Sequence, residues 1–417
     1  MPRLQGAFQC LGRTEEIALS ITEISGFPAP QRRTAPFQLV AVCLSRRGRF
    51  DFSFPFILAC LIAASIPATV TPALGEQNSL GTATLTLDTC QDTGLPNGTC
   101  YRAVISDCPE STGEFAVAVK INEAPNPNLL KGTVFFTTGG GGELFYDYDP
   151  SYLGSAKCPD SNCGLMVVQS INSANFQTVQ TNFEDPANII QEPAGWLTGP
   201  SADGPRSLAC RYATLVHAVW TILLQSDTSH PVCATGNSGG GAAIAYAITQ
   251  YGMGNNSGPG PFFTMVEPTS GPPYGRIDHG CEGSAAPVEI VSCPAGDRIS
   301  ENYGIETAQE FVDPAYSSDS CVRDIQSNGR DGDPNFYHDS VLSDDFPAPS
   351  YKTFVRALYG SEDLSEAVPL GLEWYNAITS SKTVACIAGA PHELPSNFEA
   401  ATTIVSDVTT LCKSDKR

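Results

Sequence analysis

Basic side chains are scarce in this sequence. It has 23 Lys and Arg against 44 Asp and Glu, which gives a formal net charge of -21. A protein that binds nucleic acid needs a basic surface to meet the phosphates, so this composition argues against a nucleic-acid partner. Charged residues make up only 16% of the chain and hydrophobic residues 41%. That balance is typical of a chain that buries a sizeable core rather than of a disordered one.

Long apolar runs and metal-binding spacings are also missing. The apolar stretch at residues 52–66 is short and contains Pro55, so it predicts no stable membrane span. The chain has 15 Cys, but no two of them have C-x-x-C spacing and no Cys/His cluster resembles a zinc site. We therefore expect no metal ion and no other cofactor. The sequence makes no prediction of the oligomeric state.

The N-terminal region has the pattern of an export signal. Arg46, Arg47 and Arg49 precede the apolar stretch at 52–66, and small residues follow it up to Ala73. A basic segment, an apolar segment and small residues near a cleavage point describe a secretory signal peptide. We therefore predict an N-terminal extension and signal peptide over residues 1–75, and a secreted, extracellular protein formed by residues 76–417.

Cysteine usage agrees with an oxidising compartment. Twelve Cys follow residue 75, an even number that permits up to six disulfides. Spacing suggests two local pairs, Cys158–Cys163 and Cys281–Cys293. Two N-glycosylation sequons, at Asn97 and Asn255, predict a glycoprotein if the chain passes through a eukaryotic secretory route.

Strand and helix patterns alternate over most of residues 76–417. We expect strands at 82–87, 115–120, 132–138, 165–168, 231–235, 262–266, 353–359 and 382–388, and helices at 209–224, 242–248, 368–378 and 397–411. This alternation predicts an α/β fold with a mostly parallel central sheet flanked by helices. Residues 268–345 are too long for a simple connection and predict a loop-rich, disulfide-containing insertion in a single domain.

The strongest chemical motif is the G-x-S-x-G sequence at residues 236–240. It lies between a short apolar strand and a helix of small residues, which is the context that a nucleophilic serine of this type requires. The serine must sit on a tight, strained turn so that its hydroxyl projects above the sheet, and the flanking glycines permit that turn. We therefore predict that Ser238 is a nucleophile rather than an incidental serine of a Gly-rich turn.

A serine nucleophile needs a base, and the chain has only five His. His392 follows the last predicted strand and comes after the serine in the chain, so it is our candidate, with His279 and His338 as alternatives. The imidazole needs an orienting carboxylate. Asp363 follows the strand at 353–359 and is the favoured acid, while Glu267, at the end of the strand at 262–266, is an alternative.

Acyl transfer also needs donors for an oxyanion. Residues 139–142 are four consecutive glycines after a predicted central strand, and their backbone N–H groups can turn toward a reacting carbonyl oxygen. We expect Gly140 or Gly141 to supply one donor and Gly239, the residue after the nucleophile, to supply the other.

Together these segments resemble the α/β-hydrolase superfamily, in particular its secreted serine esterases and lipases, over residues 110–412. The resemblance implies a serine hydrolase that cleaves a small or polymeric carboxylic ester through Ser238, His392 and Asp363 and an acyl-enzyme. It points to no narrower family. Three readings remain beside it: a peptidase or amidase, an acyltransferase, and a secreted binding protein without catalysis.

Overall fold

The computed structural model describes residues 78–90, 94–109, 113–183, 195–197, 204–255, 263–282, 303–316, 318–329 and 335–413. The chain divides into two units at residues 70/71, and the described residues belong to the second. The predicted extension and signal peptide at 1–75 lie outside the described residues. Among those residues, no helix combines the length and apolar character needed to cross a membrane.

Nine strands form one sheet in the order β1-β2-β3-β5-β4-β6-β7-β8-β9. Strands β1 (Thr82–Asp88), β2 (Thr99–Ser106) and β3 (Phe115–Asn122) form an antiparallel meander, and β3 pairs antiparallel with β5 (Phe176–Asn182). From β5 onward every pair is parallel, through β4 (Gly132–Thr137), β6 (Val232–Asn237), β7 (Phe263–Thr269), β8 (Phe354–Gly360) and β9 (Lys382–Ile387). The predicted mostly parallel α/β sheet is confirmed.

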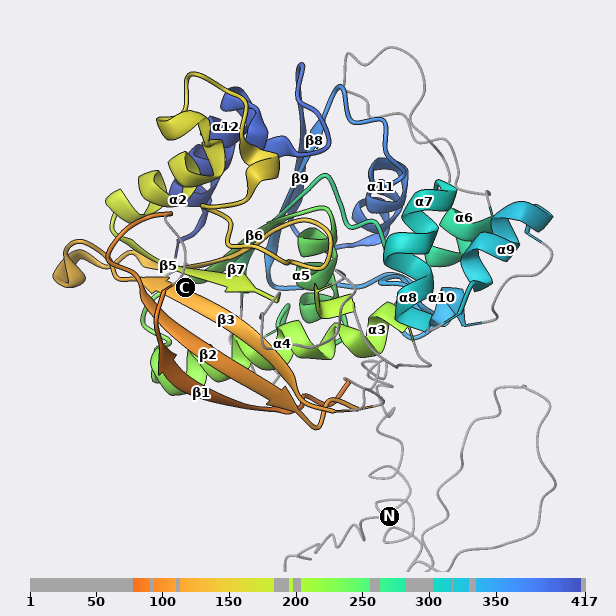
Figure 1. Cartoon of the computed structure of the whole chain (residues 1–417), viewed down its shortest axis with the longest axis horizontal. Helices are drawn as coiled ribbons and strands as arrows, with labels where there is room; N and C mark the ends of the chain where they lie inside the picture. The colour runs from red at the N-terminus through yellow and green to blue at the C-terminus, as the bar shows by residue number, and fades with distance from the viewer. Residues whose placement is uncertain are drawn as a thin grey trace, which may run out of the picture. The chain divides into compact units, whose positions relative to one another are not determined.

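Helices cover both faces of this sheet (Figure 1). One buried apolar cluster joins the sheet to α4 (Cys210–Ala218), α5 (Gly239–Thr249) and α11 (Ala367–Ala377). A second joins it to α2 (Cys163–Ser173) and α12 (Phe398–Leu411). The central strands are buried on both faces, as parallel strands between two helical layers must be, and all six residues of β4 are buried.

The predicted strand at 165–168 is wrong, because these residues lie in helix α2. The Asn162 side chain accepts a hydrogen bond from the Leu165 N–H at 3.0 Å and so caps the helix. The buried positions Gly164, Val167, Val168 and Ile171 have helical spacing. The four apolar residues 165–168 belong to this helical pattern, but taken alone they resemble a short buried strand.

Strand β5 was not predicted because its buried side chains are polar. Thr178, Gln180 and Thr181 are all fully buried, and the Gln180 side chain donates to Asp147 at 2.9 Å. Polar groups inside a core need such partners, and a sequence pattern based on apolar residues does not detect them. Strand β2 was also missed.

Between β7 and β8 the described residues form short helices: α6 (Ile277–Glu282), α7 (Ile305–Thr307), a π-helical turn (Ala308–Val312), α8 (Asp313–Tyr316), α9 (Ser320–Ser327) and α10 (Phe336–Asp339). The Cys281–Cys321 disulfide ties α6 to α9, so the expected Cys281–Cys293 pair is wrong. Sequence proximity suggested that pair, but α6 packs against α9. This packing places the Cα atoms of Cys281 and Cys321 5.1 Å apart.

Four more disulfides join described cysteines: Cys90–Cys100, Cys108–Cys210, Cys158–Cys163 and Cys233–Cys412. The predicted Cys158–Cys163 pair is confirmed, and Cys386 is disulfide-bonded as well. The Cys233–Cys412 bond attaches the end of α12 to the central strand β6, which leads directly into the predicted nucleophile.

Candidate active site

Ser238 occupies the sharp turn between β6 and α5. Its backbone has φ 49° and ψ -116°, a strained conformation for a residue with a side chain. Gly236 and Gly240 make the turn possible, since a Cβ added to Gly240 would lie 2.5 Å from the Thr138 carbonyl oxygen. Because Ser238 immediately precedes α5, its side chain lies at the positive end of the helix dipole, which favours developing negative charge.

The Gly-rich loop at residues 139–142 packs directly on this turn. A Cβ at Gly239 would collide with the Gly140 carbonyl oxygen, so the two backbones approach as only glycine allows. Gly140 has φ 56°. The Gly141 N–H is already donated to the Glu143 carboxylate at 3.0 Å, so the expectation that Gly141 could be a donor is not supported by the geometry. Gly140 and Gly239 both line the pocket and remain the candidate pair.

His392 and Asp363 come together from the loops after β9 and β8. The His392 Nδ1 lies 3.1 Å from one Asp363 oxygen and 3.2 Å from the other. Ser365 joins them: its hydroxyl donates to Asp363 at 2.7 Å and lies 2.9 Å from the same Nδ1. With the Nδ1 proton held by this pair, the Nε2 nitrogen is the one available to accept a proton.

The two ionisable groups influence each other's pKa. Burial by itself would raise the pKa of Asp363, but hydrogen bonds from His392 and Ser365 hold it below its usual value. Burial by itself would lower the pKa of His392, but the hydrogen bond and charge of Asp363, together with Glu393 and Glu366, raise it. The site therefore favours an ionised carboxylate beside an imidazole that binds a proton readily.

Glu267, the alternative acid, lies elsewhere. It is fully buried in β7, and neither carboxylate oxygen makes a hydrogen bond of normal geometry with the described residues. Burial, with the nearby charge of Asp407 on α12, raises its pKa well above the usual value. The structure thus brings Asp363, and not Glu267, to His392.

Three of the other four histidines have partners of their own away from the pocket, and the fourth, His217, lies in α4. His279 contacts Glu373 at 2.8 Å, His338 contacts Arg206 at 3.0 Å, and His230 contacts Asp227 at 2.8 Å. None of them lines the pocket. The two alternative bases, His279 and His338, therefore do not meet Ser238 in this structure.

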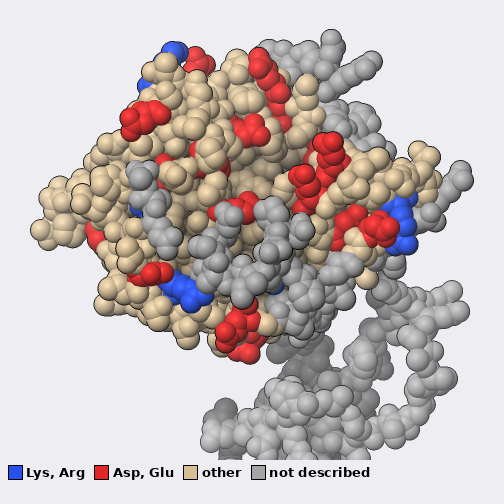
Figure 2. All heavy atoms as spheres, viewed as in Figure 1, with Lys and Arg blue, Asp and Glu red and all other residues tan. Residues whose placement is uncertain are grey.

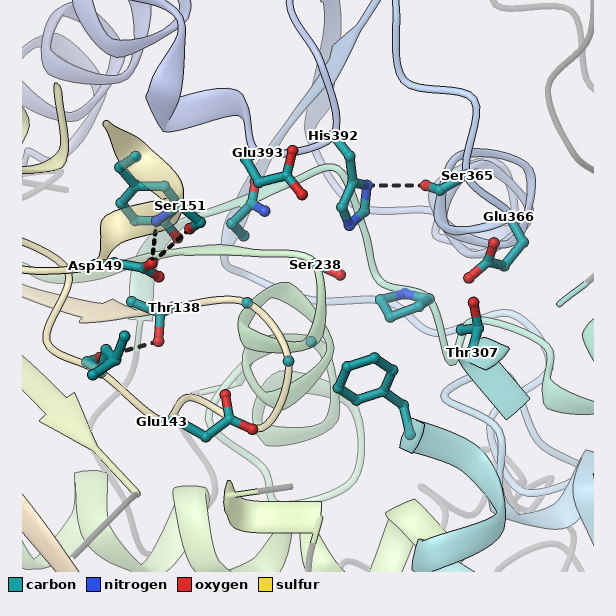
Figure 3. Close-up of a pocket in the computed structure, with 18 of the residues that line it drawn as sticks. Thr138, Glu143, Asp149, Ser151, Ser238, Thr307, Ser365, Glu366, His392 and Glu393 are labelled. Atoms are coloured by element: carbon teal, nitrogen blue, oxygen red, sulfur yellow. Dashed lines mark hydrogen bonds between the residues drawn. The ribbon is translucent and has the colours of Figure 1, made fainter. Parts of the chain in front are cut away.

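Ser238 and His392 line one pocket of about 420 Å³, although the described residues show no direct hydrogen bond between them. Figure 3 shows both side chains directed into the same space. The other lining residues are four carboxylates, four aromatic rings and small or polar groups: Glu143, Asp149, Glu366, Glu393, Tyr152, Tyr274, Tyr303, Phe311, Thr138, Gly139, Gly140, Leu144, Ser151, Asn237, Gly239, Pro273, Thr307 and Ser365.

Sequence reasoning missed Ser365 and the four carboxylates. Ser365 and Glu366 follow Asp363 closely in the same loop, so a search around the predicted acid could have found them. Glu143 and Asp149 follow the Gly-rich loop in the same way. The described residues contain no group of three or more His, Cys, Asp or Glu arranged to hold a metal ion.

An antiparallel meander leads into a parallel sheet, a strained serine follows β6, and the histidine follows β9. This arrangement has the layout of the α/β-hydrolase fold. No protein-family model matches the chain, and no curated protein matches its sequence.

Solved structures of similar fold include enzymes and an α/β-hydrolase domain protein. Acetyl xylan esterase 1 from Thermoanaerobacterium has a TM-score of 0.40 and 14% identity, covering 78% of this chain and 87% of its own. Mouse α/β-hydrolase domain-containing protein 10 has 0.40 and 14%, covering 74% and 97%. The acylaminoacyl peptidase of Pyrococcus horikoshii has 0.46 and 11%, covering 80% and 50%.

Proposed function

We propose that this chain is a serine hydrolase that cleaves a carboxylic ester. The observation that carries the proposal is that a strained Ser238 and a His392 held by Asp363 line the same pocket. A strained turn costs free energy, on the order of 1–3 kcal/mol, and here it presents a hydroxyl to the pocket that the oriented imidazole, Gly140 and Gly239 also line.

The reaction follows from these positions. The His392 Nε2 takes the proton of the Ser238 hydroxyl as its oxygen attacks the acyl carbon. The N–H groups of Gly239 and Gly140 stabilise the oxyanion of the tetrahedral intermediate. His392 then gives its proton to the departing alcohol, which leaves an acyl-enzyme. Water, deprotonated by the same imidazole, attacks the acyl-enzyme. His392 then returns that proton to the Ser238 oxygen, which releases the acid and free Ser238.

Labelling with a fluorophosphonate probe tests the nucleophile and its base. We expect the wild type to be labelled and Ser238→Ala and His392→Ala to lose labelling while remaining folded. His230→Ala is a matched control, because His230 also contacts an aspartate, Asp227, at 2.8 Å but lies outside the pocket. Full labelling of folded Ser238→Ala would refute the assignment.

Comparing the turnover of different substrates distinguishes ester hydrolysis from the alternative activities. Hydrolysis of p-nitrophenyl esters of increasing acyl length, compared with the matching p-nitroanilides, should show ester cleavage with a preference for one chain length. Faster cleavage of the anilides would identify an amidase instead. Labelling without turnover of either series, but with acyl transfer to an added alcohol, would identify an acyltransferase.

We also propose that the protein is secreted and that residues 1–75 are removed. All the described disulfides favour an oxidising compartment. Asn97, in the first sequon, is exposed, as a glycan site must be. Expression of the full chain in a eukaryotic secretory host should yield protein in the medium whose first residue lies near 75. Retention of the intact N-terminus inside the cell would contradict the proposal.

A further inference from the structure

The pocket carries an excess of negative charge. Four carboxylates line it, from Glu143, Asp149, Glu366 and Glu393, while no Lys or Arg is among the described lining residues. Figure 3 shows Glu366 and Glu393 on either side of His392 and Glu143 across the pocket from them. The wider surface has the same sign: on the face drawn in Figure 2, acidic side chains outnumber basic ones.

Two of these carboxylates already have structural partners. Asp149 accepts hydrogen bonds from the N–H and the hydroxyl of Ser151, at 2.8 and 2.6 Å, and Glu143 accepts from the Gly141 N–H. These hydrogen bonds show that Glu143 and Asp149 help to hold the loop after β4 in place. Such bonds to N–H and hydroxyl groups do not neutralise the negative charges of the two carboxylates.

Glu366 and Glu393 come from the loops after β8 and β9. Neither makes an ion pair with a Lys or Arg of the described residues, although the Thr307 side chain lies beside the Glu366 carboxylate. Burial raises the pKa of Glu366 and the nearby Asp363 adds to this, while His392 and Thr307 act in the opposite direction. When the oxyanion forms, the proton moves from Ser238 to His392, so the net charge of the site does not change and the lining carboxylates remain its main charge. A substrate that brings a positive charge is attracted by these carboxylates.

Aromatic rings lie near Glu366. Tyr274, Tyr303 and Phe311 line the pocket. The Tyr274 hydroxyl donates to the Phe311 carbonyl oxygen at 3.1 Å and the Tyr303 hydroxyl donates to the Pro273 carbonyl oxygen at 2.8 Å. Because both hydroxyls are hydrogen-bonded to backbone carbonyls, Tyr274 and Tyr303 contribute mainly their aromatic rings to the lining of the pocket. Aromatic rings attract cations, and together with carboxylates they form the usual surroundings of a bound ammonium group.

One buried polar group in the pocket also lacks a good partner. Tyr152 lines the pocket and is 1% exposed. Its hydroxyl makes no hydrogen bond of normal geometry among the described residues, although the Gly139 backbone, Asp149 and Glu393 lie near it. Burial raises the pKa of this phenol well above the usual value, so it stays neutral and offers an oxygen lone pair to a donor. Buried polar groups without partners often await a ligand or water.

We propose that the substrate of this pocket is an ester that bears a cationic group, such as an ammonium, and that Glu366 and Glu393 select it. This rests on the proposed ester hydrolysis, which it makes more specific. The cation lies among these two carboxylates and the aromatic rings while Ser238 attacks the ester carbonyl. A neutral ester of the same shape fits the same volume but leaves the carboxylates uncompensated.

The test uses two esters that differ in charge and not in shape. Butyrylcholine carries a trimethylammonium group, and 3,3-dimethylbutyl butyrate has a tert-butyl group in its place. We measure kcat/KM for both with the same preparation, so that the ratio is independent of the active fraction. We expect the wild type to favour the cationic ester by about tenfold or more, as a desolvated cation beside carboxylates and rings implies.

Variants that remove one negative charge each test which carboxylates cause the preference for the cationic ester. Glu366→Gln and Glu393→Gln should each lower the ratio, and the double variant should bring it close to one. Glu362→Gln is the matched control, because Glu362 is an exposed glutamate of the same loop that does not line the pocket, and it should keep the wild-type ratio. A wild-type ratio near one, or a ratio that the double variant leaves unchanged, would overturn the proposal and leave the two carboxylates acting on the charge of His392 alone.

Binding to Ser238→Ala separates this proposal from the proposed function. If the wild type hydrolyses neither ester, calorimetric titration of Ser238→Ala with both still decides the question. Tighter binding of butyrylcholine, lost in the Glu366→Gln/Glu393→Gln background, would support cation selection even if ester hydrolysis fails. Equal binding, or no binding of either, would overturn cation selection. Hydrolysis of both at equal rates would overturn it while leaving the esterase function intact.

Discussion

The buried Lys120–Asp147 ion pair supports the segment that follows the Gly-rich loop. The Lys120 Nζ lies 2.9 Å from an Asp147 oxygen, and the two side chains are 2% and 0% exposed. The same oxygen accepts hydrogen bonds from the Leu95 N–H at 2.8 Å and the Gln180 amide at 2.9 Å. Lys120→Met would leave a buried carboxylate with these two neutral donors and no cation. Breaking a buried pair on one side costs about 3–5 kcal/mol of the free energy of unfolding.

Urea unfolding with the disulfides intact measures that cost. We expect a lower midpoint for Lys120→Met with an unchanged m-value. In Lys120→Met/Asp147→Asn the buried charge is gone while an amide oxygen still accepts a hydrogen bond, so most of the loss should be recovered, to within about 2 kcal/mol of the wild type. Lys352→Met, at an exposed lysine, is the control. If Lys120→Met costs no more than this control, the pair is not a source of stability.

Three further outcomes follow from the structure. Ser365→Ala removes two hydrogen bonds from the acid–base pair, so kcat should fall about 5- to 30-fold with KM unchanged, and Ser365→Thr should restore it; an equal rise in KM would point to a binding role. Because the pKa of His392 is raised and only the neutral imidazole is a base, kcat/KM should rise with pH through a midpoint above 6.5, and a midpoint at or below 6.5 would contradict the assigned surroundings. Replacing the Cys233–Cys412 disulfide, with a sequence separation of 179, by alanines should cost roughly 5 kcal/mol in thermal or urea unfolding, against roughly 2 kcal/mol for Cys158–Cys163, with a separation of 5. The reverse order would show that chain entropy is not what these bonds contribute.

Most strands and helices of the fold could be predicted from local sequence patterns. The buried apolar strands β4, β6, β7 and β8 were expected near their observed positions, because a parallel strand between two helical layers has an almost continuous apolar sequence. Strand β5 was not predicted because its buried residues are polar, and Gln180 and Thr181 are hydrogen-bonded to partners far away in the chain. Helix α2 was misread for the same kind of reason: a short apolar run does not reveal which period it belongs to.

The candidate site shows the same division. The turn around Ser238 is encoded in five consecutive residues, since glycines and a serine between a strand and a helix permit few other conformations, and chain order was enough to suggest His392 and Asp363. Sequence favoured Asp363 but could not exclude Glu267, because each was expected at or just after the end of a strand. Glu267 lies in a strand whose pleat directs it to the α12 face, whereas Asp363 lies beyond its strand, in a loop beside the histidine.

The sequence by itself determined an α/β sheet, a strained serine and the residues that could serve it, because each of these depends on neighbours a few positions away. Only the tertiary structure decided which acid meets the histidine, which glycine N–H remains available and which cysteines pair. It also gathered Glu143, Asp149, Glu366 and Glu393 around one pocket from three separate loops. Distances between residues far apart in the chain depend on the order of the strands in the sheet and on the packing of the helices. A local sequence pattern does not determine either of these.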